Sequence, residues 1–261
     1  MNYWTELSIE FANQRNYLDE LFKVYPTIPE AIREMDSDKF SKVEDAFKRK
    51  DNTALIKSLL ALPLFPIKDS YVAYLKRDSA SIERNPETVA RLCGRVYEMG
   101  LNEIFRCSSI PKEMNRQIGP LFKRWLHKGT LGLALLDAKE FAQSKKNALF
   151  NGSDAEMMAY AKEHLGYRGD KGLDFLARMR NTYVIGEAKF LTDLGGHQNA
   201  QFEDAKALLK NKKTNAIKVA ILDGVLYIKG RNKMYNYLTT HAQKYNILSS
   251  LLLREFLYAI K

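Results

Sequence analysis

Apolar side chains recur three or four residues apart through most of the first 165 residues, which is the spacing of amphipathic helices. This spacing is clear over residues 3–24, and a second apolar helix opens at Asn52 and stops before Pro63. Ser153 and Glu156 have the spacing of a capping box, in which each side chain accepts a hydrogen bond from the other residue's backbone amide. The first part of the chain is therefore predicted to be largely helical.

The pattern changes to that of strands after residue 165. An apolar run that holds Asp174 is followed by a polar turn at Arg180-Asn181 and by a second apolar run over residues 183–186. β-Branched and aromatic residues on both sides of a short polar turn predict a β-hairpin. Gly195-Gly196 then breaks the chain, and a helix-like run begins near His197.

A second hairpin is predicted further along the chain. Residues 216–222 have the composition of a strand, Asp223-Gly224 that of a type I′ turn, and residues 225–228 that of the partner strand. Residues 233–243 and 248–260 have helical spacing and are expected to close the chain.

The later half is thus predicted to run strand, strand, helix, strand, strand, helix. This order predicts an α/β (α+β) fold with a mixed central β-sheet flanked by helices, joined to a largely helical N-terminal half. The 261 residues suit one large domain or two small ones and suffice for a substantial core. We expect a single domain over residues 1–261, with a helical part (1–149), a core (150–230) and C-terminal helices (231–261).

The end of the first hairpin carries charged side chains at a chemically useful spacing. Glu187 and Lys189 are two residues apart on the second strand, so their side chains share one face, and Asp174 can approach them if the strands pair. Two carboxylates beside an ammonium suit a hard cation such as Mg²⁺, which prefers oxygen ligands. Such a cation activates water and stabilises charge on a phosphodiester, while the lysine helps to hold or deprotonate the nucleophile. The predicted reaction is cleavage of a nucleic-acid backbone.

An acid two residues before a lysine also occurs at Asp137-Ala138-Lys139 and at Asp204-Ala205-Lys206. The first follows an apolar run, but no Asp between Asp78 and Asp137 could serve as its hairpin partner. The second lies in a run with helical spacing. Glu187 alone combines an upstream Asp, a turn and a β-rich run. The alternative interpretation is a surface hairpin with a solvated Glu–Lys pair.

This constellation resembles the PD-(D/E)XK nuclease superfamily, and its surroundings resemble a type II restriction endonuclease. The resemblance covers residues 150–230 and does not reach the first half of the chain. In it, Asp174 matches the family's first metal ligand, Glu187 the second and Lys189 the lysine. The backbone carbonyl of Ala188 is implied as a third metal ligand.

Three nearby positions need separate comment. Gly172-Leu173 stand where the family's name-giving proline would be, which is a departure from the motif. Glu156 and Glu163, on the helix before Asp174, are each candidates for an additional metal ligand. For Glu156 the capping box is the better account.

The resemblance implies a Mg²⁺-dependent, sequence-specific endodeoxyribonuclease that leaves 5′-phosphate and 3′-hydroxyl ends on double-stranded DNA. A palindromic or near-palindromic site implies a homodimer, because two-fold symmetric proteins match such sites. The helical first part would supply dimer contacts and arms around the duplex, and a companion DNA methyltransferase would protect the host genome. A repair or recombination nuclease of the same superfamily and a non-catalytic basic DNA-binding protein remain as alternatives.

The charge balance favours a polyanionic partner. Lys and Arg number 41 against 31 Asp and Glu, a net charge of +10 with a pI near 9.4. Cys93 and Cys107 form neither a metal-binding spacing nor a disulfide framework, as is usual in a reducing cytoplasm. We see no signal peptide, no apolar run near the length of a membrane span and no Gly-rich phosphate loop. We expect a cytoplasmic protein without ATP-driven activity and without a membrane partner.

Two groups of residues after the first hairpin are candidates for DNA contact. At the start of the helix near Gly195, these are His197, Gln198, Asn199 and Gln201. Their amides could read adenine edges in the major groove, although cap and turn chemistry explains them equally well. Residues 206–233 contain a single acid, Asp223, and eight cations. The cations are Lys206, Lys210, Lys212, Lys213, Lys218, Lys229, Arg231 and Lys233. Lys212 and Lys213 are predicted to contact phosphates, with a solvated face as the alternative.

Overall fold

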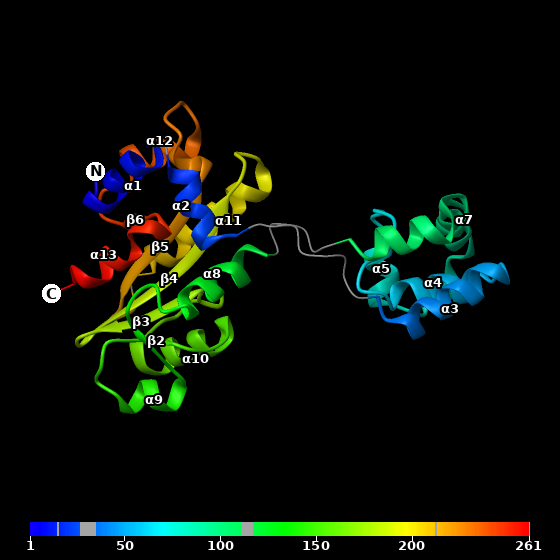
Figure 1. The fold of residues 1–261 in the computed structure, drawn as a ribbon, viewed down its shortest axis with the longest axis horizontal. Helices are drawn as coiled ribbons and strands as arrows, with labels where there is room; N and C mark the ends of the chain where they lie inside the picture. Colours follow the sequence, from blue (N-terminus) through cyan, green and yellow to red (C-terminus); the bar gives the residue numbers. More distant parts are fainter. Residues whose placement is uncertain (15, 27–34, 111–116, 212, 261) are drawn as a thin grey trace. The chain divides into compact units, whose positions relative to one another are not determined.

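The computed structural model of the chain describes residues 1–14, 16–26, 35–110, 117–211 and 213–260. These residues form two compact units (Figure 1). The sheet unit comprises residues 1–27 and 113–261, and the helical unit comprises residues 28–112. The single domain with a boundary after residue 149 that the sequence predicts is therefore not what the structure has: the helical unit is inserted into the sheet unit. Helical periodicity is alike in both units and does not reveal which core each helix joins.

The described part of the helical unit contains α3 (Ser37–Lys48), α4 (Asn52–Leu60), α5 (Val72–Arg77), α6 (Ser81–Arg84) and α7 (Pro86–Ser108). The side chains of Val43, Leu55 and Leu92 are fully buried in its core. α4 begins where the sequence predicts, because the Asp51 carboxylate accepts a hydrogen bond from the Ala54 amide at 2.9 Å. The unit thus has a hydrophobic core of its own.

The sheet unit is built on one mixed sheet, in the order β1-β2-β3-β4-β5-β6 among the described residues. The strands are β1 (Ala134–Leu136), β2 (Ala148–Phe150), β3 (Phe175–Met179), β4 (Thr182–Leu191), β5 (Ile217–Gly224) and β6 (Asn246–Leu248). β2–β3 and β3–β4 are antiparallel, whereas β1–β2, β4–β5 and β5–β6 are parallel. In Figure 1 the long strands β4 and β5 run through the middle of this unit.

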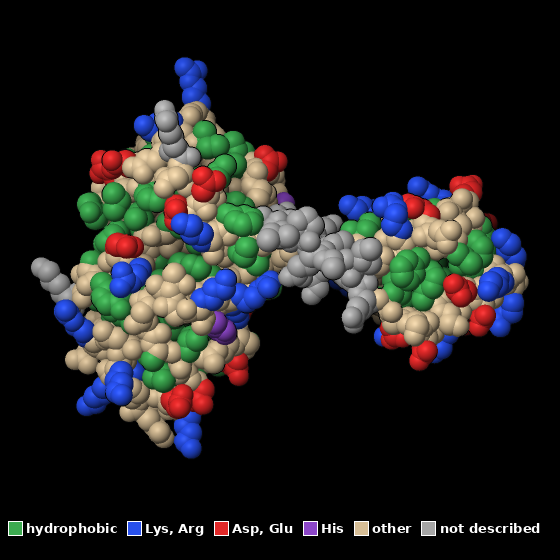
Figure 2. Space-filling model, in the orientation of Figure 1, with side chains coloured by type: hydrophobic (Ala, Val, Ile, Leu, Met, Phe, Trp, Pro, Cys, Tyr) green, Lys and Arg blue, Asp and Glu red, His purple; other side chains and the backbone are tan. Residues whose placement is uncertain are grey.

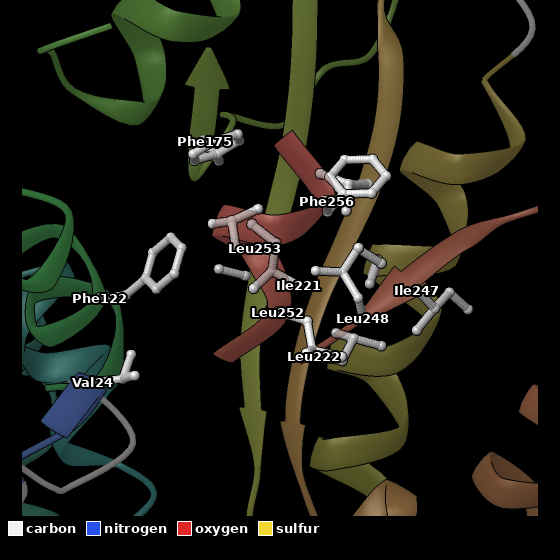
Figure 3. Packing of buried hydrophobic residues seen from close by; sticks show 14 of the residues in the cluster. Val24, Phe122, Phe175, Ile221, Leu222, Ile247, Leu248, Leu252, Leu253 and Phe256 are labelled. Carbon is white, nitrogen blue, oxygen red and sulfur yellow. The ribbon is translucent and has the colours of Figure 1, made fainter. Parts of the chain in front are cut away.

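Helices cover both faces of the sheet. They are α1 (Tyr3–Ala12), α2 (Tyr17–Val24), α8 (Ile118–His127), α9 (Ala138–Gln143), α10 (Asp154–Leu165), α11 (Gly196–Lys210), α12 (Lys233–Thr240) and α13 (Leu253–Tyr258). Because strand side chains alternate, Val184 joins the larger core with Phe122 of α8, while Ile185 joins a second core with Tyr160 of α10. Figure 3 shows Phe256 and neighbouring residues of the larger core. The predicted mixed sheet flanked by helices, with a largely helical N-terminal half, is confirmed.

The short strands were not predicted. β1 and β2 lie in the half predicted to be helical, and β6 takes up Leu248, the first residue of a predicted closing helix, inside the range predicted as C-terminal helices. Each of these strands has three residues, which is too few to show a period of two. β2 and β6 form by pairing with the longer strands β3 and β5, and β1 forms by pairing with β2. The predicted helix over residues 3–24 is also divided, into α1 and α2.

The predicted second hairpin is wrong. β5 continues through Asp223 and Gly224, and residues 225–227 form a short 3₁₀ helix, η2 (Val225–Tyr227). β5 is paired on both edges, with β4 and with β6, so no edge is left for a hairpin partner. Gly224 has a φ of 99°, and a Cβ there would lie 2.1 Å from the Leu191 carbonyl oxygen. The Asp-Gly pair therefore marks a close approach of two strands.

Asp223 is fully buried and serves as an acceptor for three donors. The Tyr25 hydroxyl donates to its carboxylate at 2.9 Å and the Ser249 hydroxyl at 2.5 Å. The Ser250 backbone amide donates to the same carboxylate at 3.2 Å. Burial raises the pKa of Asp223, and these hydrogen bonds oppose that rise. The carboxylate ties the end of β5 to α2 and to η3 (Ser250–Leu252).

We expect Asp223→Ala to destabilise the sheet unit by roughly 3 kcal/mol, because three buried donors lose their acceptor at about 1–3 kcal/mol each. A solvent-exposed turn residue would change stability by only about 0.5 kcal/mol. Both tryptophans, Trp4 and Trp125, lie in the sheet unit, so urea unfolding followed by their fluorescence reports on this unit. Asp223→Asn, which keeps one acceptor oxygen, is the control and should lose less. A loss within 0.5 kcal/mol for Asp223→Ala would contradict the buried role.

Among the described residues, no helix combines the length and apolar character needed to span a membrane.

Candidate active site

The β3–β4 hairpin brings the predicted acids and the lysine together. The strands pair from Met179–Thr182 to Phe175–Gly186, across a two-residue turn in which Arg180 has a φ of 56°. Asp174 lies immediately before β3, and its backbone amide donates to the Gly186 carbonyl at 3.1 Å. The predicted hairpin is confirmed, and it sets Asp174 beside the second half of β4.

The three side chains meet at the open end of this hairpin. The ammonium of Lys189 lies 2.8 Å from Oδ2 of Asp174 and 2.6 Å from Oε1 of Glu187. The backbone amide of Ala188 donates to the same Asp174 oxygen at 2.9 Å. One cation therefore reaches both carboxylates, and the backbone of β4 fixes the orientation of Asp174.

Burial makes this cluster electrostatically demanding. Glu187 is only 8% exposed, and burial, followed by the Asp174 carboxylate, raises the pKa of Glu187 to about 7. Burial also disfavours the charged form of Lys189, but the two carboxylates outweigh it and raise the pKa of this lysine. Two acids thus share one ammonium, and the site is short of positive charge. Asp204 of α11 adds a smaller contribution that raises the pKa of Glu187.

The donor atoms fit a hard divalent cation. Asp174 and Glu187 offer carboxylate oxygens that already converge on one positive group, the Lys189 ammonium. In a strand the N–H and C=O of one residue point to the same edge, so the Ala188 carbonyl faces the edge on which its amide meets Asp174. Within the described residues, no group of three or more His, Cys, Asp or Glu side chains is arranged to hold a metal. Mg²⁺ usually needs only one or two protein carboxylates.

The two glutamates on α10 have other roles or remain apart. Glu156 closes the predicted capping box, with its carboxylate accepting from the Ser153 amide at 2.6 Å and from the Ser153 hydroxyl at 2.7 Å. Glu163 is exposed and lies 3.8 Å from the imidazole of His164. The structure therefore gives Glu156 a structural function and shows no contact between Glu163 and the cluster.

The two other acid-x-lysine matches do not form such a cluster. Asp137 caps α9, with its carboxylate accepting from the Glu140 amide at 2.8 Å, and Lys139 is exposed. Asp204 forms an ion pair with Lys171. Lys206 pairs with Glu203 and packs over the ring of Tyr237. Of the three matches, Glu187-Ala188-Lys189 alone has a lysine that contacts both its own acid and a second carboxylate among the described residues.

A cavity of about 150 Å³ opens beside the cluster. The residues that line it are Asp174, Ala188, Lys189, Phe190, Ile118, Gly119 and Gln201. Tyr25 supports one wall by stacking on Phe190, with ring centroids 5.1 Å apart. The sequence carries no periodic signal that would bring α8 to this site, since residue 118 and residue 189 meet only through the tertiary fold.

The comparison with known families identifies the enzyme class of the chain. The model of the Tsp45I type II restriction enzyme family matches residues 2–260. The chain belongs to the Tsp45I type II restriction enzyme family. A search of curated proteins and a search of solved structures each found no match. The prediction of a type II restriction endonuclease is therefore confirmed, and DNA is its partner.

In this restriction enzyme, the predicted amide readers lie at the start of α11 but differ in their surroundings. Gln198 is buried. Its side-chain oxygen accepts a hydrogen bond from the Thr192 backbone amide, and its side-chain nitrogen donates one to the Thr192 hydroxyl, each at 3.3 Å. Asn199 donates to the Leu194 carbonyl at 3.2 Å. His197 and Gln201 contact one another through their Nε2 atoms at 3.2 Å. Gln198 thus holds the turn before α11, while Gln201 reaches the cavity.

The predicted phosphate contacts are less uniform than the run of cations indicates. Lys218 donates to the Leu209 carbonyl at 3.0 Å and to the Asn211 carbonyl, so it caps the end of α11. Lys206 is also used within the fold. Lys213 is exposed, and Lys212 lies outside the described residues. At least these two cations, Lys206 and Lys218, have structural partners, which sequence spacing does not show.

Proposed function

We propose that Asp174, Glu187 and Lys189 form the cleavage centre of a Mg²⁺-dependent endonuclease of the PD-(D/E)XK superfamily. It hydrolyses DNA phosphodiesters at a specific sequence and leaves 5′-phosphate and 3′-hydroxyl ends. The observation that carries this proposal is the convergence of two carboxylates and one ammonium at the end of the β3–β4 hairpin. Membership in a type II restriction enzyme family supports the same reaction class.

Asp174, Glu187 and the Ala188 carbonyl are the proposed Mg²⁺ ligands. When bound, Mg²⁺ polarises the phosphodiester and makes a water more acidic. A divalent cation also suits the charge of this site, because two acids share a single ammonium here. The Ala188 amide donates to the Asp174 carboxylate, so this ligand is already oriented without substrate.

Lys189 is proposed to orient and polarise the attacking water. An ammonium has three N–H donors, and two of them are occupied by Asp174 and Glu187. The remaining donor is available to a water or to a phosphate oxygen in the adjoining cavity. Holding a nucleophile in line with the phosphorus is a large part of catalysis in phosphoryl transfer.

The net charge of +10 supports binding of the DNA backbone. Figure 2 shows Lys and Arg side chains spread over the drawn face of both units, interspersed with acids. Exposed cations such as Lys213 and Lys229 are proposed to contact phosphates. A homodimer is proposed to match the two-fold symmetry of a palindromic or near-palindromic site. A companion DNA methyltransferase would protect the host genome at that site.

The test is digestion of unmethylated plasmid DNA with Mg²⁺, followed by sequencing of the fragment ends. We expect discrete fragments whose ends share one short sequence, carry 5′-phosphates and disappear in EDTA. Cleavage only at branched or damaged DNA would instead favour a repair or recombination nuclease. Binding without cleavage under every divalent cation would contradict the enzyme proposed here.

A further inference from the structure

Helix α11 places the amide side chain of Gln201 beside Lys189 at the proposed cleavage centre. The helix runs antiparallel to β4: Leu208 shares a core cluster with Ile185, and one turn earlier Asp204 acts electrostatically on Glu187. About one further turn back, Gln201 lines the cavity together with Lys189. The spacing 201, 204, 208 follows one face of a helix. Gln201 is thus held at the cavity by a regular helix–strand contact.

The Gln201 amide nitrogen can contact His197 and still donate to a ligand. This Nε2 atom lies 3.2 Å from Nε2 of His197, one turn earlier on the same helix. An amide NH2 group carries two hydrogens, and one of them can be donated to an acceptor Nε2 of a neutral imidazole. The second N–H is left for a ligand that enters the cavity. Asn199 differs, because it lines another groove with Lys206 and Tyr237.

We propose that Gln201 is a catalytic residue that donates a hydrogen bond to a non-bridging oxygen of the scissile phosphodiester. His197 is the positioning residue that fixes the Gln201 amide. A neutral donor suits this place, because another cation would compete with Lys189 for the two carboxylates. The inference rests on the proposed function, and it assigns Gln201 to the cleavage step and not to reading bases.

The role needs no proton transfer by the amide. In the hydrolysis a water oxygen forms the new bond to phosphorus, and the bond from phosphorus to the 3′-oxygen breaks. The water loses its proton to solvent, and the leaving 3′-oxygen gains one from solvent. Gln201 keeps all its protons and acts by stabilising the charge that grows on the non-bridging oxygen.

The experiment is single-turnover cleavage of the sequence found by the plasmid digest, with dissociation constants measured in Ca²⁺. Gln201→Ala should cleave ~100-fold more slowly, as expected on removal of one transition-state donor. Its affinity for cognate and random duplexes should stay within about twofold, because the interaction is made in the transition state. Glu203→Ala, on the same helix but outside the cavity, removes an exposed partner of Lys206; it is the matched control and should cleave at the normal rate.

His197 is tested by conservative rescue. His197→Ala should lower the single-turnover rate roughly tenfold without changing affinity, as loss of a supporting partner does. His197→Gln, which can still bond the Gln201 amide, should retain more of the rate than His197→Ala. A merely structural role of His197 would lower the thermal midpoint and the rate together and would not show this rescue.

A substrate with one non-bridging oxygen of the scissile phosphate replaced by sulfur tests the contact itself. With one of the two diastereomers, the slowing caused by sulfur should be smaller in Gln201→Ala than in the wild-type enzyme. Normal cleavage by Gln201→Ala, or normal cleavage with lost cognate affinity, would overturn the inference; the second result would make Gln201 a base reader. If Asp174→Ala is inactive in the same assay, such a failure concerns Gln201 alone and leaves the proposed cleavage centre intact.

Discussion

Asp174→Ala and Glu187→Ala are each expected to lower DNA cleavage by at least about a thousandfold, because a Lewis-acid contribution of several kcal/mol is lost with the cation. Both carboxylates converge on the Lys189 ammonium, so removing either one dismantles the proposed ligand set. DNA binding should remain largely intact, since phosphate contacts elsewhere supply the affinity. Cleavage is measured in Mg²⁺ and binding in Ca²⁺, which accepts looser geometry than Mg²⁺ and should support binding without cutting.

The same variants allow a readout that does not depend on activity. A cation that binds only the folded protein raises its thermal midpoint. We expect Mg²⁺ and Ca²⁺ to raise the midpoint of the wild-type sheet unit, followed by fluorescence of Trp4 and Trp125, and to leave that of Asp174→Ala unchanged. Asp137→Ala is the matched control: it removes a helix cap worth about 1 kcal/mol and should keep both cleavage and the cation effect. Normal cleavage by Asp174→Ala would remove this residue from the site.

Lys189→Ala is expected to reduce the single-turnover rate by roughly 10²–10⁴-fold, the usual effect of losing a positioned catalytic group. The Lys189 ammonium is held beside the cavity by both carboxylates. A cation from solvent would not be fixed there by a side chain and would not replace it. Lys189→Arg should rescue little, because the guanidinium is a planar fork and the ammonium a compact charge. The measurement is the rate of cleavage of bound cognate duplex under saturating Mg²⁺.

The two other acid-x-lysine matches provide matched controls for this lysine. Lys139 is exposed beside a helix cap, so Lys139→Ala should cleave at the normal rate. Lys206 pairs with Glu203 and covers Tyr237, so Lys206→Ala should act through stability and not through the chemical step. An inactive Lys139→Ala beside a fully active Lys189→Ala would show that the assigned centre is wrong.

The sequence pattern of a short segment was sufficient to predict the structure where neighbouring residues determine it. The β3–β4 hairpin followed from a β-rich run interrupted by two polar residues, and the start of α11 followed from Gly195-Gly196. The capping box of Ser153 and Glu156 begins α10 as predicted. Because side chains alternate along a strand, the shared face of Glu187 and Lys189 was also readable from their spacing.

The sequence pattern of a short segment gave a wrong or no prediction where residues far along the chain determine the structure. Asp223-Gly224 has the composition of a hairpin turn, yet Tyr25, Ser249 and Ser250 surround the aspartate and β5 continues as a buried parallel strand. The short strands β2 and β6 pair with the longer strands β3 and β5, and β1 pairs with β2. The insertion of the helical unit has no sequence signal, since helices of both units show the same apolar period.

The sequence by itself determined the pair Glu187 and Lys189 on one strand face, the acid upstream of it, and the excess of positive charge that points to DNA. These are properties of short segments or of composition. Only the tertiary structure decided that the Asp174 carboxylate accepts a hydrogen bond from the Ala188 amide and contacts the Lys189 ammonium. It alone decided that Gln198 is buried while Gln201 borders the cavity with α8. The physical reason is that strand register and helix packing depend on long-range contacts, which one chain segment does not encode.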